Sequence, residues 1–340
     1  MSGRPMVATL FAMLCLSAPA PGQPGPGPAA APGKPLDEQP EKQIETITEK
    51  ADDAKGPVAL NKEGTVLLDA KRKILTVKSR VVLRQGMLEM LLCKAHTKEH
   101  ESILAFDGHA FILHAGLVAL GVDPGTPVQF QPDFKTPEGP KLKIELVWTG
   151  NDGKEHRADA RSWVRHSIHR YFGEPLEALP PGLVLPQDSD LRYDKINKQL
   201  SWYGPMTVKQ RDELLALSRD ETFRKAVQTF YDRGQSRPME TDWVFVGSMF
   251  ARDEESGRKV YLAESGDVIC VANFPTAMID VAAQSSATGQ ENLLFEAWTE
   301  RIPAVGTAVQ VQITPVVDEP EAGKQVEPKR NGKKVSLPQD

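Results

Sequence analysis

The residues best suited to chemistry in this chain lie between Cys93 and Ser102, in the string CKAHTKEHES. It holds one of the three cysteines, two of the seven histidines and two glutamates. Apolar runs flank it at residues 87–92 and 103–106. Reactive side chains between two buried segments are typical of a functional site. A metal centre, a catalytic pair and a recognition patch are all open at this stage.

A metal centre would use Cys93, His96 and His100, whose spacing is Cys-x2-His-x3-His. Thiolate and imidazole are the ligands that zinc prefers, and His109 or His114 could complete the set from the next predicted helix. The string lacks the paired Cys-x-x-Cys motifs of a structural zinc site. Zinc is therefore a possible cofactor, and no cofactor is predicted.

A catalytic site would pair Cys93 with His96 or His100 as its base. Such a cysteine needs a lowered pKa and partial exposure. Two leucines come directly before Cys93, so a buried and inert thiol is the alternative. A disulfide between Cys93 and Cys270 is also open.

A recognition patch for a protein or a cell-envelope polymer fits a non-catalytic protein best, because charged and titratable side chains supply donors and acceptors together. The candidate binding residues are Lys98, Glu99, His100, Glu101 and His114. The simpler alternative to such a patch is an ordinary solvated face. The simpler alternative to the metal site is a helix start, with Thr97 as its N-cap and two glutamates in its first turn. His114 would then be a hydrogen-bonded core histidine.

Composition bounds the function. The chain has 340 residues, enough for one large or two modest domains, and 40% of them are hydrophobic, as in ordinary globular proteins. A formal charge of −5 argues against a nucleic-acid partner, which would require a basic surface. The sequence has no phosphate-binding glycine loop, no Gly-x-Ser-x-Gly and no His-Glu-x-x-His, so the enzyme classes that these motifs mark are not indicated.

The N-terminus predicts export. Arg4 precedes an apolar run at residues 6–16, and small residues follow at 20–22, which is the pattern of a signal peptide over residues 1–22. The run is too short to span a membrane, so no transmembrane segment is expected after cleavage. Lipid attachment at Cys15 and an uncleaved anchor are the alternatives. We expect a periplasmic or extracellular protein.

Low-complexity segments bound the folded part. Residues 23–57 form a predicted linker that is first rich in Pro, Ala and Gly, which predicts an extended segment, and then charged, which predicts a solvated segment or a frayed helix over residues 36–56. Residues 318–340 are charged and predict a disordered tail. The folded part therefore runs from about residue 58 to residue 317.

Within the folded part, β patterns dominate. A hairpin is predicted over residues 66–77, a strand over 128–130 and an alternating strand over 141–148, whose turn at 151–153 favours a return strand. Residues 109–120 are apolar on nearly every side and predict a buried helix. The sequence predicts an α+β fold: a β-rich domain, in two parts at 58–174 and 239–317, with one buried helix.

Between these parts, residues 175–238 predict an inserted two-helix hairpin. A small β-hairpin comes first, and two helices follow with capping-box spacings that begin at Thr207 and Ser218. A module of about 45 residues is too small for a robust core of its own, so we expect it to lean on the β-rich domain.

Two sets of strings resemble the YdjY-domain family of exported bacterial proteins. They lie at residues 82–90, 97–102 and 112–115, and at 243–248, 271–275 and 303–307. The strings TKEHES and NFP carry most of the resemblance. The family is largely uncharacterised, so the resemblance implies no reaction. A ferredoxin-like label attached to part of it does not imply an iron–sulfur cluster here, because such a cluster usually needs four thiolates. The inserted module resembles a short unit found in large bacterial surface and toxin-like proteins.

The sequence thus predicts an exported, non-catalytic binding or structural protein of the cell envelope, with an unknown envelope protein or polymer as its partner. The alternative is a metal-binding or Cys–His catalytic site between Cys93 and His114.

Overall fold

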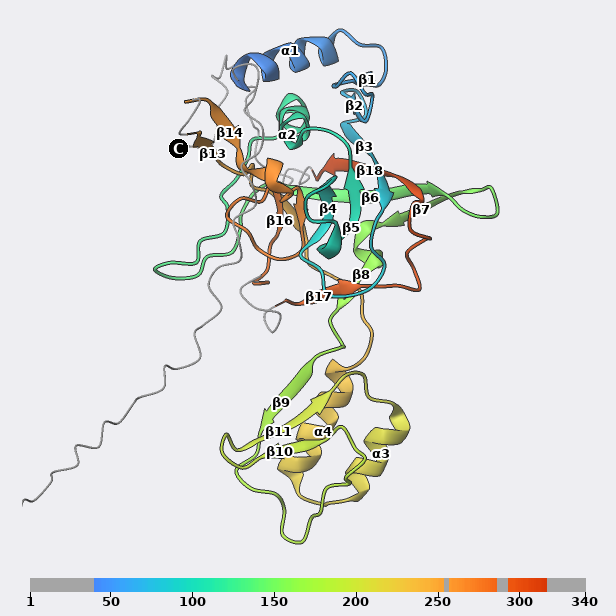
Figure 1. The fold of residues 1–340 in the computed structure, drawn as a ribbon, viewed down its shortest axis with the longest axis vertical. Coiled ribbons are helices and arrows are strands. Elements are labelled where there is room, and N and C mark those ends of the chain that lie inside the picture. Colours follow the sequence, from blue (N-terminus) through green and yellow to red (C-terminus); the bar gives the residue numbers. More distant parts are fainter. Residues whose placement is uncertain (1–39, 254–256, 286–292, 317–340) are drawn as a thin grey trace, which may run out of the picture. The chain divides into compact units, whose positions relative to one another are not determined.

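The computed structural model of the protein describes residues 40–253, 257–285 and 293–316 (Figure 1). The predicted signal peptide at residues 1–22 and the predicted tail at residues 318–340 lie outside these residues. So does the first part of the linker predicted over residues 23–57.

Eight strands form a closed barrel, because the last strand in the pairing order pairs with the first. In that order the strands are β3 (Ile74–Val81), β18 (Ala308–Pro315), β6 (Lys141–Thr149), β12 (Trp243–Phe245), β16 (Ile279–Val281), β15 (Ile269–Cys270), β4 (Met90–Lys94) and β5 (Ser102–Phe106). Most neighbours are antiparallel, but β4 pairs with β5 and β15 pairs with β16 in parallel. The α+β class is confirmed, and the closure of the sheet is new.

Side-chain alternation identifies the two faces of the barrel wall. Lys78, Gln310 and Lys143 on β3, β18 and β6 are exposed, whereas Val77 and Val311 beside them are buried. Because successive residues of a strand point to opposite faces, the exposed residues mark the outer face and the buried ones fill the interior.

On the side of the barrel formed by β12, β15, β4 and β5, the outer face is buried as well. Small apolar side chains cover it and form a cluster apart from the main core: Met90, Cys93, Ala105, Val244, Val246, Cys270 and Ala277. Phe274, from the loop after β15, packs against this cluster. The polar residues described below lie on this wall.

Two helices complete the main core. Helix α2 (Ala110–Ala119) is buried along most of its length, as predicted, and its Gly116 lies so close to Leu75 that a Cβ atom would come within 2.7 Å of a Leu75 methyl carbon. Helix α1 (Pro40–Asp52) contacts α2 and buries Ile44 and Ile47. The prediction of one buried helix is therefore not confirmed. Residues 40–52 are no solvated linker, since their apolar residues recur at helical spacing and reach the core.

Shorter strands and turns extend the barrel. The predicted hairpin is formed by β2 and β3, and the predicted return strand after β6 is β7. The strand predicted over residues 128–130 is instead an isolated bridge between Gln129 and Lys135. The bounds are β1 (Val58–Ala59), β2 (Val66–Asp69), β7 (Glu155–Asp159), β8 (Val164–His166), β13 (Phe250–Arg252), β14 (Lys259–Tyr261), β17 (Phe295–Ala297), and the 3-10 turns η1 (Glu99–Glu101), η2 (Ala160–Trp163) and η3 (Leu262–Ser265).

The inserted module is a three-stranded sheet with two helices against it (Figure 1). Its elements are β9 (Tyr171–Pro175), β10 (Arg192–Asp194), β11 (Gln199–Tyr203), α3 (Val208–Ala216) and α4 (Glu221–Arg233). The expectation that the module leans on the β-rich domain stays a prediction. Apart from the main core, the buried residues of the module form a core of their own. Strand β9, which begins before the predicted boundary, contributes Phe172 to that core. Thr207 and Gln210 form the predicted capping box, whereas Asp220 rather than Ser218 caps α4.

Within the described residues, no helix has the length and apolar character needed to cross a bilayer.

Candidate functional site

The string CKAHTKEHES forms the end of β4, a tight crossover and the start of β5. Parallel strands need a connection that runs back along one face of the sheet, and residues 95–101 do so in very few residues. His96 adopts a left-handed conformation (φ 64°), and the Thr97 hydroxyl donates to the Lys94 carbonyl at 2.5 Å. Gly266 (φ 120°) lies against Thr97, where a Cβ atom would come within 2.4 Å of the hydroxyl oxygen. A side chain at position 266 would therefore displace the crossover.

The crossover carries Lys98 into a group of carboxylates on the buried outer wall. Its Nζ lies 3.0 Å from Asp267 Oδ1, 3.5 Å from Glu89 Oε2 and 3.6 Å from Glu101 Oε1. It also lies 4.1 Å from the centre of the Phe274 ring, a cation–π distance. We call these five residues the Lys98 cluster. It joins the two strings TKEHES and NFP, which are far apart in the chain.

Lys98 keeps its charge although its side chain is only 18% exposed. Burial alone would lower the pKa of Lys98, but Asp267, Glu89 and Glu101 raise it above its usual range. Removing a charged group from water costs several kcal/mol, so a buried ammonium needs such partners. The lysine is thus a fixed cation that holds the crossover against the barrel wall.

Glu89 and Glu101 both lie within 3.6 Å of this cation. Burial and, to a lesser extent, the neighbouring Glu101 raise the pKa of Glu89, Lys98 opposes them, and the resulting pKa is about 7. Near neutral pH the cluster therefore gains or loses a proton readily.

Hydrogen bonds fix the loop that carries Phe274. Asp267 Oδ2 accepts from the Thr276 hydroxyl at 2.5 Å, and Asn273 Nδ2 donates to Asp280 Oδ1 at 3.1 Å and to the Val281 carbonyl at 3.2 Å. The hydrogen bonds of Asn273 therefore anchor the Asn-Phe-Pro string, and the ring of Phe274 faces Lys98.

Asp280 is a second carboxyl group with a raised pKa. It is fully buried on β16, and its Oδ2 has no hydrogen-bond partner among the described residues. Burial raises the pKa of Asp280 to about 7, although the Val281 amide and Asn273 act in the opposite direction. A buried carboxylate without full hydrogen bonding is costly, so the protonated form is favoured below neutral pH.

The remaining predicted binding residues of the turn differ in exposure. Glu99 is paired with Arg80 of β3 at 3.1 Å. His100 projects to solvent with 76% of its side chain exposed, and its Nε2 lies 3.6 Å from Glu101 Oε2. The structure thus brings Lys98, Glu99, His100 and Glu101 together on one turn, with His100 as the most open of the four.

His114 is not part of this patch. It is fully buried on α2, on the interior side, where its Nδ1 lies 3.2 Å from the Tyr261 hydroxyl and its ring lies near Phe245. Burial lowers the pKa of His114 to about 4. It is therefore a neutral core histidine, the simpler of the two interpretations.

The metal and catalytic hypotheses find no assembled site in the described part of the chain. Cys93 is fully buried, whereas His96 and His100 are exposed, and no three His, Cys, Asp or Glu residues described here lie together as metal ligands would. Burial raises the pKa of Cys93, and burial raises that of Cys270 well above its usual range. Both thiols are free.

Lys94, at the end of β4, belongs to a second ionic group. Its Nζ lies 2.6 Å from Glu264 Oε2, which also lies 3.4 Å from His109 Nδ1. Glu264 Oε1 accepts from the Phe111 amide at 3.0 Å and so caps α2 from a distant turn. Burial would raise the pKa of Glu264, but His109, Lys94 and the amide lower it overall.

Sequence reasoning missed Glu89, Asp267, Asp280 and Glu264. A signal was present for the first three, because each is a lone acid beside or inside an apolar run. Acidic residues in such runs are buried only when they are paired or neutralised. The sequence could therefore have marked them as members of a buried polar group, although not which cation they meet.

A family model described as the YdjY domain matches residues 65–172 and 188–314, which is more than half of the chain. No curated protein and no solved structure matches.

The buried carboxyl of Asp280 predicts a specific pH dependence. Its folded pKa is raised from 3.8 to about 7, so the proton that it holds stabilises the fold at low pH, and this stabilisation is lost as the pH rises through 7. Asp280→Asn keeps an acceptor for the Val281 amide and removes the charge. We expect the variant to be more stable than the parent by about 2 kcal/mol at pH 8, and by much less at pH 5, in urea unfolding.

The control is Asp123→Asn, which alters an exposed carboxylate. It should shift stability little at either pH. A variant at position 280 that loses stability equally at pH 5 and pH 8 would contradict the buried, protonated carboxyl.

Proposed function

The chain belongs to the YdjY-domain family, and from this premise we propose that it is an exported, non-catalytic binding or structural protein of the cell envelope. Export rests on the signal pattern of Arg4 and the apolar run at residues 6–16. The family assignment itself supplies no ligand. The proposal therefore rests on the ion pairs and the exposure of the turn at residues 98–101, which we call the Lys98 turn.

The observation that carries the proposal is that ion pairs hold the Lys98 turn in place while one of its side chains stays exposed to solvent. Lys98 is tied to Asp267, Glu89 and Glu101, and Glu99 is tied to Arg80, while 76% of the His100 side chain remains exposed. A surface whose side chains are already ordered loses less entropy when a partner binds. The turn is therefore suited to recognition, with His100 as its main contact and the ion pairs as its support.

A catalytic role has weaker support from the same residues. A nucleophilic cysteine needs a lowered pKa and access to substrate. Cys93 has a raised pKa and is fully buried. The exposed imidazole of His100 meets Glu101 rather than a thiol.

The binding proposal is tested by placing a photo-reactive amino acid at position 100 of the full chain in cells that export it. We expect a discrete covalent adduct from position 100. The matched control is position 305, since Val305 is 63% exposed and lies in the segment before β18. Adducts that are identical at the two positions, or missing from position 100, would count against recognition through this turn.

The catalytic alternative is tested on protein purified without chelator or added metal. We expect less than a tenth of an equivalent of zinc or iron, and we expect Cys93 and Cys270 to react with a thiol reagent only after unfolding, because both are buried. One zinc per chain that is lost in His100→Ala, or rapid labelling of native Cys93, would favour the metal or Cys–His site instead.

A further inference from the structure

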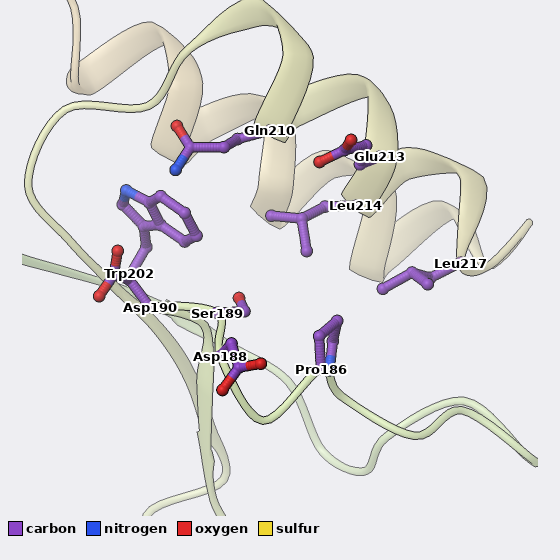
Figure 2. Close-up of a pocket in the computed structure, with 9 residues that line it drawn as sticks. All are labelled: Pro186, Asp188, Ser189, Asp190, Trp202, Gln210, Glu213, Leu214 and Leu217. Atoms are coloured by element: carbon purple, nitrogen blue, oxygen red, sulfur yellow. The ribbon is translucent and has the colours of Figure 1, made fainter.

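The inserted module contains a cleft whose lining includes no residue of the Lys98 turn. It lies between α3 and the loop at residues 186–190, with Trp202 of β11 at one end, beside Gln210 (Figure 2). The cavity has a volume of about 470 Å³, within the range of peptide and small-molecule sites. Its lining residues are Pro186, Asp188, Ser189, Asp190, Trp202, Gln210, Glu213, Leu214 and Leu217.

One part of the lining is apolar. Trp202 and Leu214 are 2% and 5% exposed and belong to the core of the module. Leu217, directly after α3, is 39% exposed, and Pro186 faces it from the loop (Figure 2). An exposed leucine opposite an exposed proline leaves apolar surface that a ligand would cover.

The other part is acidic. Asp188, Asp190 and Glu213 are exposed, and the described residues that line the cleft include no Lys, Arg or His. Two cations lie nearby. Lys209 is 3.8 Å from Glu213 but is itself 84% exposed, and Arg192 donates to the carbonyls of Ser189 and Leu191.

The remaining polar side chains of the cleft are already engaged. Gln210 belongs to the capping box with Thr207, and the Ser189 hydroxyl accepts from the Leu191 amide. The three carboxylates are therefore the groups left to meet a ligand, and they carry more negative charge than the nearby cations neutralise.

We propose that this cleft binds a basic, apolar segment of a partner protein, in which lysine or arginine alternates with leucine-like residues. The aliphatic stem of such a cation can lie along Leu217 and Pro186 while its charged end reaches Asp188, Asp190 or Glu213. A neighbouring apolar side chain of the same partner segment covers the rest of Leu217. The proposal concerns a different surface from the Lys98 turn, and it holds or fails independently of that turn.

The test measures binding of a capped peptide of alternating lysine and leucine to the full chain by fluorescence anisotropy. We expect saturable binding that weakens with salt. The triple variant Asp188→Asn, Asp190→Asn, Glu213→Gln should weaken it at least tenfold, and Leu217→Ser severalfold, because one set removes the charge and the other the apolar contact. These residues are on the surface, and unchanged circular dichroism verifies that the variants fold.

Controls separate the proposed occupant from others. Asp212→Asn, beside Glu213 on α3 but outside the cleft, should leave binding unchanged. Equal affinity for a lysine–serine peptide, for a glutamate–leucine peptide or for spermine would overturn the proposal, as would unchanged binding by the triple variant. Self-association of the chain that the triple variant abolishes would also overturn it, in favour of a second copy as the occupant.

Discussion

The ammonium group of Lys98 needs partners because it is largely removed from water, and this requirement ties together three segments of the chain. Asp267 follows the glycine that gives the crossover room, Glu89 leads into β4, and Glu101 leads into β5. A buried cation is tolerated only with opposite charges close by, so the segments must meet at the barrel wall. The ionic contact thus sets the path of the crossover, and the crossover determines where Glu99 and His100 are displayed.

Much of the fold could be predicted from local patterns. The β2–β3 hairpin, the return strand β7, the buried helix α2 and the capping box at Thr207 all follow from periodicity and turn chemistry. Barrel closure could not be predicted, because it depends on pairings between distant strands such as β3 and β5. For α1 the charged composition left a solvated segment or a frayed helix open, and its burial was missed because its charged residues outnumber its few buried apolar ones. The separate core of the module was missed because β9 begins before the composition changes.

The candidate site was predicted only in part. The string at residues 98–101 does form one polar turn, but His114 lies in the core and Cys93 is buried, because helical and strand positions place them on faces that the string alone does not reveal. The carboxylates that neutralise Lys98 come from other segments. The two polar regions also differ in exposure: the carboxylates of the Lys98 cluster surround one largely buried ammonium, whereas the cleft of the module has exposed carboxylates beside an apolar edge.

The account depends most on a strong coupling between Lys98 and Asp267, which a double-mutant cycle measures directly. The cycle compares the free energies of unfolding of Lys98→Met, Asp267→Asn and the double variant with that of the parent protein. A buried pair predicts that the double variant loses less stability than the sum of the single losses, by about 2 kcal/mol, since each single change removes the nearest partner of a largely buried charge. The exposed pair Lys198–Glu177, whose atoms are 2.6 Å apart, is the control and should show far weaker coupling. Simple additivity at Lys98 and Asp267 would contradict the central role of this ion pair.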